Sequence, residues 1–182
     1  MMCEPVASRD PEIAPPPEVQ AYYAGFPEES RLESGVSRLE FERTKEILAR
    51  VLPAPPARIV DVGGGAGAYS LSLAERGYEV HLVDASPRLV AEARTRSAKS
   101  TTPIASLSVA DARRLPQDNG SAAAVLVMGP LYHLPLAVDR VAALREAFRI
   151  VAGNGIAVVA AISRFASANT ARLRIFSRTP SR

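Results

Sequence analysis

The chain has few of the residues that build cross-linked or metal-bound frameworks. Cys3 is the one cysteine among 182 residues, so neither an intrachain disulfide nor a cysteine-based zinc site can form, and we predict no metal site. No apolar run approaches the roughly 20 residues that a membrane-spanning helix needs. The N-terminus also lacks a basic start followed by an apolar stretch. We therefore predict no signal peptide, no membrane association and a cytoplasmic location.

Acidic residues are absent from the last twenty positions, which carry five arginines. Because the whole chain has a net charge of only +3, the remaining body is slightly acidic. Such a body offers no basic face for phosphates, so we predict no nucleic-acid partner. Twenty arginines against two lysines, with abundant alanine and proline, point to a GC-rich bacterial source.

The sequence predicts one domain between two tails. Residues 1–17 are rich in proline and acid and are expected to be disordered, whereas residues 163–182 form a basic tail. Within the domain, residues 18–162, helical spacing predicts a first helix over 18–26 and a second over about 36–52. The apolar face expected for the second helix consists of Leu39, Ile47, Leu48 and Val51.

Short apolar runs then alternate with helical patterns. The predicted strands are 58–62, 78–83, 107–109, 123–128 and 156–162, and the predicted helices are 68–76, 87–98 and 136–151. The last helix is expected to present one apolar stripe: Val138, Val141, Leu144, Ala147, Phe148 and Val151. Gly153-Asn154-Gly155 predicts a turn. Apolar strands alternating with helices require a sheet covered on both faces. The predicted fold class is therefore α/β, a doubly wound, mostly parallel, Rossmann-like sheet with N-terminal helices.

A glycine-rich turn follows the first predicted strand. Without side chains, Gly63, Gly65 and Gly67 let the backbone approach a ligand closely, and the next helix begins with free N–H groups. Such a turn suits a carboxylate or a phosphate equally well, and it also serves as a plain strand-to-helix turn. It does not identify the ligand by itself.

Acidic residues stand at the ends of the first three strands. Asp84 can accept hydrogen bonds from both hydroxyls of a ribose, or serve as a helix cap. Asp111 can accept from an adenine amine while the Ala112 N–H donates to a ring nitrogen, or it is a turn aspartate. Asp61 can hydrogen-bond a cationic amino group or hold the turn.

A dinucleotide site is the main alternative. Gly63, Gly65 and Ala68 satisfy G-x-G-x-x-G/A, and Asp84 lies at about the dinucleotide spacing. Asp61, the two helices before the first strand and the third acid, Asp111, favour S-adenosylmethionine over NAD.

These motifs together resemble the class I S-adenosylmethionine-dependent methyltransferases, of the small-molecule type, over about residues 18–162. The matching segments are 59–67, 81–84, 110–112, 125–134 and 144–151. The resemblance implies that Asp61 and the glycines hold the methionine part of S-adenosylmethionine. It also implies that Asp84, with Ala85 beside it, holds the ribose. The adenine would lie against Asp111, Ala112 and Met128.

The acceptor site is less clearly marked. His133 follows the fourth strand and is the candidate general base, while Tyr132 and Tyr23 are candidate substrate-binding residues. The loop lacks the Pro-Pro-Tyr pattern of nucleic-acid amino methyltransferases, and no interior cysteine is present for carbon methylation of RNA bases. We therefore expect a small-molecule acceptor at oxygen or nitrogen. The sequence says nothing about the oligomeric state.

The chain departs from the family at its C-terminus. The family has seven strands, and only twenty residues follow Ile162, so we expect the last two strands to be lacking. A truncated or non-catalytic S-adenosylmethionine-binding domain therefore remains an alternative to an active enzyme, and an NAD-dependent oxidoreductase is a further one.

Overall fold

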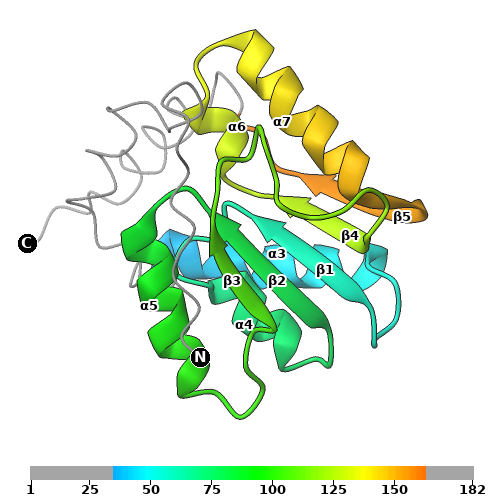
Figure 1. The fold of residues 1–182 in the computed structure, drawn as a ribbon. Coiled ribbons are helices and arrows are strands. Elements are labelled where there is room, and N and C mark those ends of the chain that lie inside the picture. Colours follow the sequence, from blue (N-terminus) through cyan, green and yellow to red (C-terminus); the bar gives the residue numbers. More distant parts are fainter. Residues whose placement is uncertain (1–34, 163–182) are drawn as a thin grey trace, which may run out of the picture.

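A computed structural model describes residues 35–162, and its centre is an all-parallel, five-stranded sheet. The strands are β1 (Arg58–Val62), β2 (Glu79–Asp84), β3 (Ser106–Val109), β4 (Ala122–Val127) and β5 (Val151–Val159). Their order is β3-β2-β1-β4-β5. The chain moves outward from β1 to β3 and then returns to the other side of β1 as β4 (Figure 1). The topological switch point therefore lies between β1 and β4.

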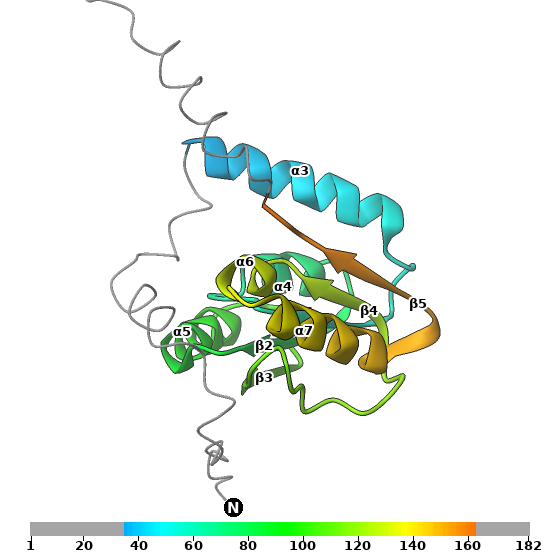
Figure 2. The same cartoon turned by 90° about the horizontal axis from the view of Figure 1, so that it is seen from above.

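Helices cover both faces of this sheet, as predicted. They are α3 (Gly35–Val51), α4 (Ala68–Ala74), α5 (Pro87–Ala98), α6 (Pro130–His133) and α7 (Ala137–Ile150). One buried cluster joins α3, α4 and α5 to one face, and a second joins α7 to the other. Figure 2 shows β5 running between α3 and α7. No helix within residues 35–162 is long and apolar enough to cross a membrane.

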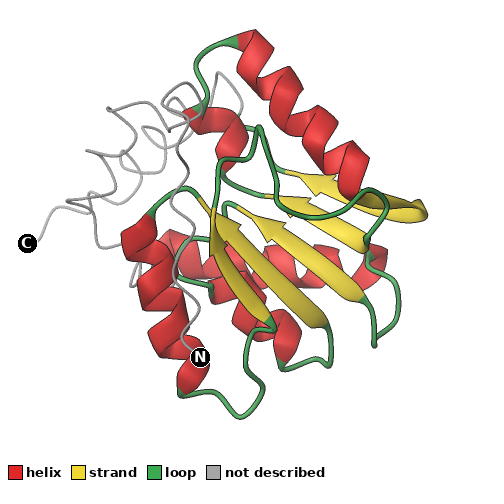
Figure 3. Ribbon diagram, viewed as in Figure 1, coloured by secondary structure: helices red, strands yellow, loops and turns green. Residues whose placement is uncertain are grey.

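The connection from β3 to β4 is a loop, whereas the other connections contain helices (Figure 3). Hydrogen bonds hold this loop against α7. Glu146 accepts from the Leu115 N–H at 2.8 Å, and Arg149 donates to the Leu115 carbonyl at 2.9 Å and to the Gln117 carbonyl at 2.7 Å. The Arg149 guanidinium lowers the pKa of the Glu146 carboxyl, so this carboxylate stays ionised at neutral pH.

Local sequence signals predicted several helix ends correctly. The α5 helix covers the predicted residues, with Pro87 in its first turn and Ser86 as N-cap accepting from the Leu89 N–H at 3.4 Å. Gly77, which follows α4, has a φ of 89°, a conformation that glycine adopts without strain. The helix predicted over 18–26 and both tails lie outside the described residues.

The predicted apolar stripe of α7 was wrong in part, since Ala147 is buried as predicted but other members of the stripe are exposed. Val138 is 70% exposed and Phe148 66%, whereas Ala143, Ala147 and Ile150 face the sheet. Small alanines let the helix backbone lie close to the strands, and this tertiary fit outweighed residue size. The same error affects α3, where Leu48 is buried but Leu39, Ile47 and Val51 are exposed.

The turn predicted at Gly153-Asn154-Gly155 was also wrong, because these residues lie inside β5. The pairing of β5 with β4 shifts register between Ala122 and Ala124. A Cβ on Gly155 would lie 2.7 Å from the Ala123 carbonyl oxygen, so the irregular ladder requires glycine there. Asn154 does not adopt the left-handed conformation.

The orientation of α7 can be tested with two truncations in the same helix. Ile150→Ala is expected to lower the free energy of unfolding by about 2–5 kcal/mol because it opens a cavity in the core. Phe148→Ala is expected to change it by about 0.5 kcal/mol or less, since this ring lies mostly in solvent. Urea unfolding followed by circular dichroism measures both, and equal losses would contradict the orientation.

Candidate functional site

The turn after β1 packs directly against the turn after β4. Gly63 has a φ of 75°, and its N–H donates to the Val83 carbonyl at 2.7 Å. A Cβ at Gly63 would lie 2.6 Å from Cδ of Pro130. Both the backbone conformation and this contact therefore require glycine. The two turns meet at the switch point of the sheet, where ligands of such folds bind.

The other two predicted glycines differ in their surroundings. Among the described residues, no atom lies within 4 Å of a Cβ placed on Gly65, whose φ is 55°. A Cβ on Gly67 would instead lie 3.3 Å from side-chain carbons of Ala93 and Ile104. Gly65 therefore borders open space, whereas Gly67 is needed for packing of the turn against α5.

Asp61 lies beneath the turn and is fully buried. Its Oδ2 accepts a hydrogen bond of 2.6 Å from the Ser70 hydroxyl in α4, which ties β1 to the helix after the turn. Its Oδ1 has no hydrogen-bond partner among the described residues. Burial raises the pKa of the Asp61 carboxyl to about 6, the Ser70 hydrogen bond opposes that rise, and the nearby Asp84 charge adds to it.

Asp84 ends β2 beside the same turn. Its Oδ2 accepts from the Gly65 N–H at 2.9 Å, and its Oδ1 accepts from the Ser86 N–H at 2.8 Å. These backbone donors fix the orientation of the carboxylate next to the open space at Gly65. Ala85 lies between them in a half-buried bend. The first two sequence motifs are therefore joined by a direct hydrogen bond.

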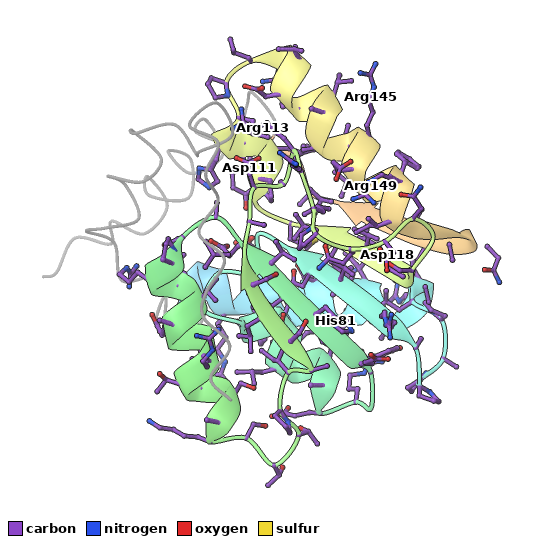
Figure 4. The ribbon with its side chains drawn as sticks, viewed as in Figure 1. His81, Asp111, Arg113, Asp118, Arg145 and Arg149 are labelled. Carbon is purple, nitrogen blue, oxygen red and sulfur yellow. The ribbon has the colours of Figure 1, made fainter. Side chains whose placement is uncertain are left out.

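Asp111 lies two residues beyond β3, in a tight turn. Its carboxylate accepts from the Arg113 backbone N–H at 2.8 Å and from the Arg113 guanidinium at 2.9 Å through both oxygens. Figure 4 shows the two residues together near the start of α7. Ala112, between them, packs against the core cluster under α7. No sequence pattern signals that Asp111 pairs with Arg113.

The chain after β4 forms a short helix that the sequence analysis missed, although Pro130 at its first turn was a signal for it. Met128 is half-buried just before it, and its carbonyl accepts a hydrogen bond of 2.6 Å from the Tyr132 hydroxyl. The rings of Tyr132 and His133 lie 4.8 Å apart, tilted against one another.

Most predicted site residues thus lie at the carboxyl ends of the strands. Parallel strands all end there, so the turn with Asp61, the acids Asp84 and Asp111, and the α6 segment follow neighbouring strands. Tyr23 lies outside the described residues. Within residues 38–162, no three His, Cys, Asp or Glu side chains gather as a metal site.

The sequence of this chain matches a known protein family and a curated relative. Residues 59–155 match the family model described as a methyltransferase domain. A curated glycine/sarcosine N-methyltransferase from Parasynechococcus marenigrum is 34% identical over 121 residues. That alignment includes 65% of this chain and 43% of the relative, so the chain spans less than half of the relative's length.

Two solved structures share the fold. The PH0226 protein of Pyrococcus horikoshii aligns with a TM-score of 0.67 and 22% identity, over 76% of this chain and 64% of its own. A SAM-dependent methyltransferase from Leishmania major aligns with a TM-score of 0.65 and 17% identity, over 76% of this chain and 58% of its own.

The chain belongs to the methyltransferase domain family, in the class I, Rossmann-like fold. The family implies S-adenosylmethionine as its cofactor, in preference to NAD.

The buried Asp61 carboxyl should make stability depend on pH. Its pKa is about 6 in the folded chain and near 3.8 when unfolded, so the folded state binds the extra proton between these values. Folding stability contributed by this group therefore falls as pH rises from about 4 to 6, by about 3 kcal/mol in total. Asp61→Asn should lose this dependence and gain stability relative to the native chain as pH rises.

Urea unfolding of both proteins between pH 4 and 7 measures the effect. Asp118→Asn, at an exposed position in the β3–β4 loop, is the matched control and should track the native chain. A difference between the native chain and Asp61→Asn that stays constant with pH would contradict the burial argument.

Proposed function

We propose that this chain binds S-adenosylmethionine at the carboxyl ends of β1, β2 and β3 and transfers its methyl group to a small molecule. The observation that carries the proposal is the set of three carboxylates that three neighbouring parallel strands bring to their carboxyl ends, with Asp84 bonded to the Gly65 N–H beside the open space. A nucleoside joined to an amino acid presents matching donors: an exocyclic amine, two ribose hydroxyls and an ammonium group.

Each part of the cofactor then has a partner on the chain. Asp84, oriented by two backbone N–H groups, accepts from the ribose hydroxyls. Asp111 accepts from the adenine amine, while the Ala112 N–H donates to the ring and Met128 lies beside it. The unpartnered Oδ1 of Asp61 fits an ammonium group, and its Oδ2 holds the turn through Ser70.

Methyl transfer requires little of the protein beyond positioning the cofactor and the acceptor. When bound, the cofactor supplies a methyl group on a sulfonium, which leaves as a neutral thioether. The chain has to align the acceptor in line with that methyl group and exclude water from the site. The α6 segment follows β4 at the switch point, which supports a role for its side chains in contacting an acceptor.

A nitrogen acceptor is favoured over an oxygen acceptor. The support is the 34% identical relative, whose name specifies N-methylation of glycine and sarcosine. An alkyl amine is protonated at neutral pH and must lose that proton before its lone pair can attack, and His133 in α6 is the candidate base that accepts it. We propose a small primary or secondary amine as the methyl acceptor.

Calorimetry tests the cofactor site. The native chain should bind S-adenosylhomocysteine and not NADH. Gly65→Ala places a methyl group in the open space and should weaken S-adenosylhomocysteine binding at least tenfold. Gly120→Ala is the matched control because Gly120 also has a positive φ and no described atom near its missing Cβ.

Both substitutions should lower stability similarly, by about 1–2 kcal/mol, because both force an L-residue into the left-handed region. Gly120 precedes β4 at the amino end of this strand, away from the proposed site at the carboxyl ends. Its variant should therefore bind like the native chain. Binding by Gly65→Ala that equals binding by Gly120→Ala would refute the proposed site.

Turnover tests the transfer step. Radiolabelled S-adenosylmethionine should pass its methyl group to glycine or sarcosine, and His133→Asn should lower kcat by about 10²-fold with little change in S-adenosylhomocysteine affinity. The chain's other histidine, His81, bonds Ser106 and Glu79 on the sheet and provides the control variant His81→Asn. Equal kcat in both variants would remove His133 from catalysis. Cofactor binding without transfer to any amine would support a non-catalytic binding domain.

A further inference from the structure

The Arg113 side chain lies between two carboxylates from different parts of the fold. Its Nε and Nη2 donate to the two oxygens of Asp111, both at 2.9 Å, which is the paired geometry that arginine forms best with a carboxylate. Its Nη1 donates to Asp139 in the first turn of α7 at 3.1 Å. Arg113 therefore connects the loop after β3 to α7.

This group of three charges is largely shielded from solvent. The side chains of Asp111, Arg113 and Asp139 are 8%, 16% and 21% exposed. Ion pairs at such positions are screened less by water and salt than surface pairs. The two carboxylates raise the pKa of Arg113, with Asp111 as the larger cause, so the guanidinium stays charged.

The hydrogen bonds to Arg113 leave the Asp111 carboxylate with one acceptor position for a ligand. A carboxylate accepts about four hydrogen bonds, two at each oxygen. Oδ1 receives two, from the Arg113 N–H and Nε, so it is saturated. Oδ2 receives one, from Nη2. A single acceptor position on Oδ2 remains, which matches one N–H of an exocyclic amine.

The loop that carries Asp111 has no helix of its own to hold it. Its far end is attached to α7 through Glu146 and Arg149, as described above. Arg113 supplies the attachment at its near end, through Asp139. Without the Arg113 side chain, the Asp111 carboxylate would keep its hydrogen bond from the backbone N–H of residue 113 but lose both guanidinium contacts.

We propose that Arg113 is a positioning residue for adenine recognition, which fixes the Asp111 carboxylate so that Oδ2 accepts from the 6-amino group, and that Asp139 supports it from α7. This inference rests on the proposed S-adenosylmethionine site. It adds a specificity determinant: the site discriminates adenine from a base that lacks the amine, and this discrimination depends on Arg113.

The test compares two ligands that differ at that group, S-adenosylhomocysteine and S-inosylhomocysteine, which carries a carbonyl in place of the amine. Arg113→Gln should weaken the adenosyl ligand about tenfold, within the range for residues coupled through one hydrogen-bond network. It should change the inosyl affinity little, so the preference for adenine falls. Asp139→Asn should shift the preference in the same direction by about threefold.

Two further variants complete the design. Arg145→Gln is the control, because Arg145 is exposed on the outer side of the same helix, α7, and the variant should match the native chain (Figure 4). Asp111→Asn measures the direct loss of the adenine acceptor. If Arg113→Gln does not fold, Arg113→Lys carries the same comparison, since lysine keeps the charge without the paired geometry.

The outcomes separate the two proposals. A native chain that binds neither ligand overturns both of them. Loss of adenine preference in Asp111→Asn but not in Arg113→Gln overturns the role of Arg113 and leaves the cofactor site standing. Equal weakening of both ligands by Arg113→Gln would mean that Arg113 only stabilises the fold, and tighter binding of the adenosyl ligand would mean that it competes with adenine.

Discussion

The contact between the turns after β1 and β4 is the constraint on which the site depends. The two strands are neighbours in the sheet, yet their chains leave it toward opposite faces, to α4 and to α6 and α7. Gly63 and Pro130 meet there so closely that a side chain on Gly63 has no room. This contact leaves Gly65, two residues further on, facing open space. The position of this space thus depends on the packing of the turns on either side of the switch point.

The three acids of the proposed site are each fixed by the chain itself. Asp61 is held by Ser70, Asp84 by the backbone of Gly65 and Ser86, and Asp111 by Arg113. A site whose carboxylates are already oriented loses less conformational freedom when a ligand binds. One of these arrangements joins two motifs, because Gly65 of the first motif donates to Asp84 of the second, whereas Arg113 ties the third motif to the first turn of α7.

The fold and family are those of methyltransferases, and the transfer step is proposed from them. The site holds acceptors suited to a nucleoside and an ammonium group, but methyl transfer adds only modest demands on protein side chains. The acceptor must therefore be argued from the relative's chemistry and from the α6 segment, where Tyr132 and His133 lie together. The chain spans less than half of that relative's length.

The sequence by itself determined the fold class and which residues could contact a bound molecule. Apolar runs alternating with helical patterns predicted the parallel sheet, because only a sheet covered on both faces buries such strands. The chain positions of Asp61, Asp84 and Asp111 at strand ends followed from the same pattern.

Other features were decided only by the tertiary structure. Parts of the buried faces of α3 and α7 were mispredicted, because helix orientation depends on how the helix packs on the sheet and not on where its largest apolar residues lie. The difference between Gly65 and its neighbours, and the pairing of Arg113 with Asp111 and Asp139, depend on atoms from separate elements. No periodicity or spacing in one chain encodes such contacts, because they arise where strand order and helix packing bring distant residues together.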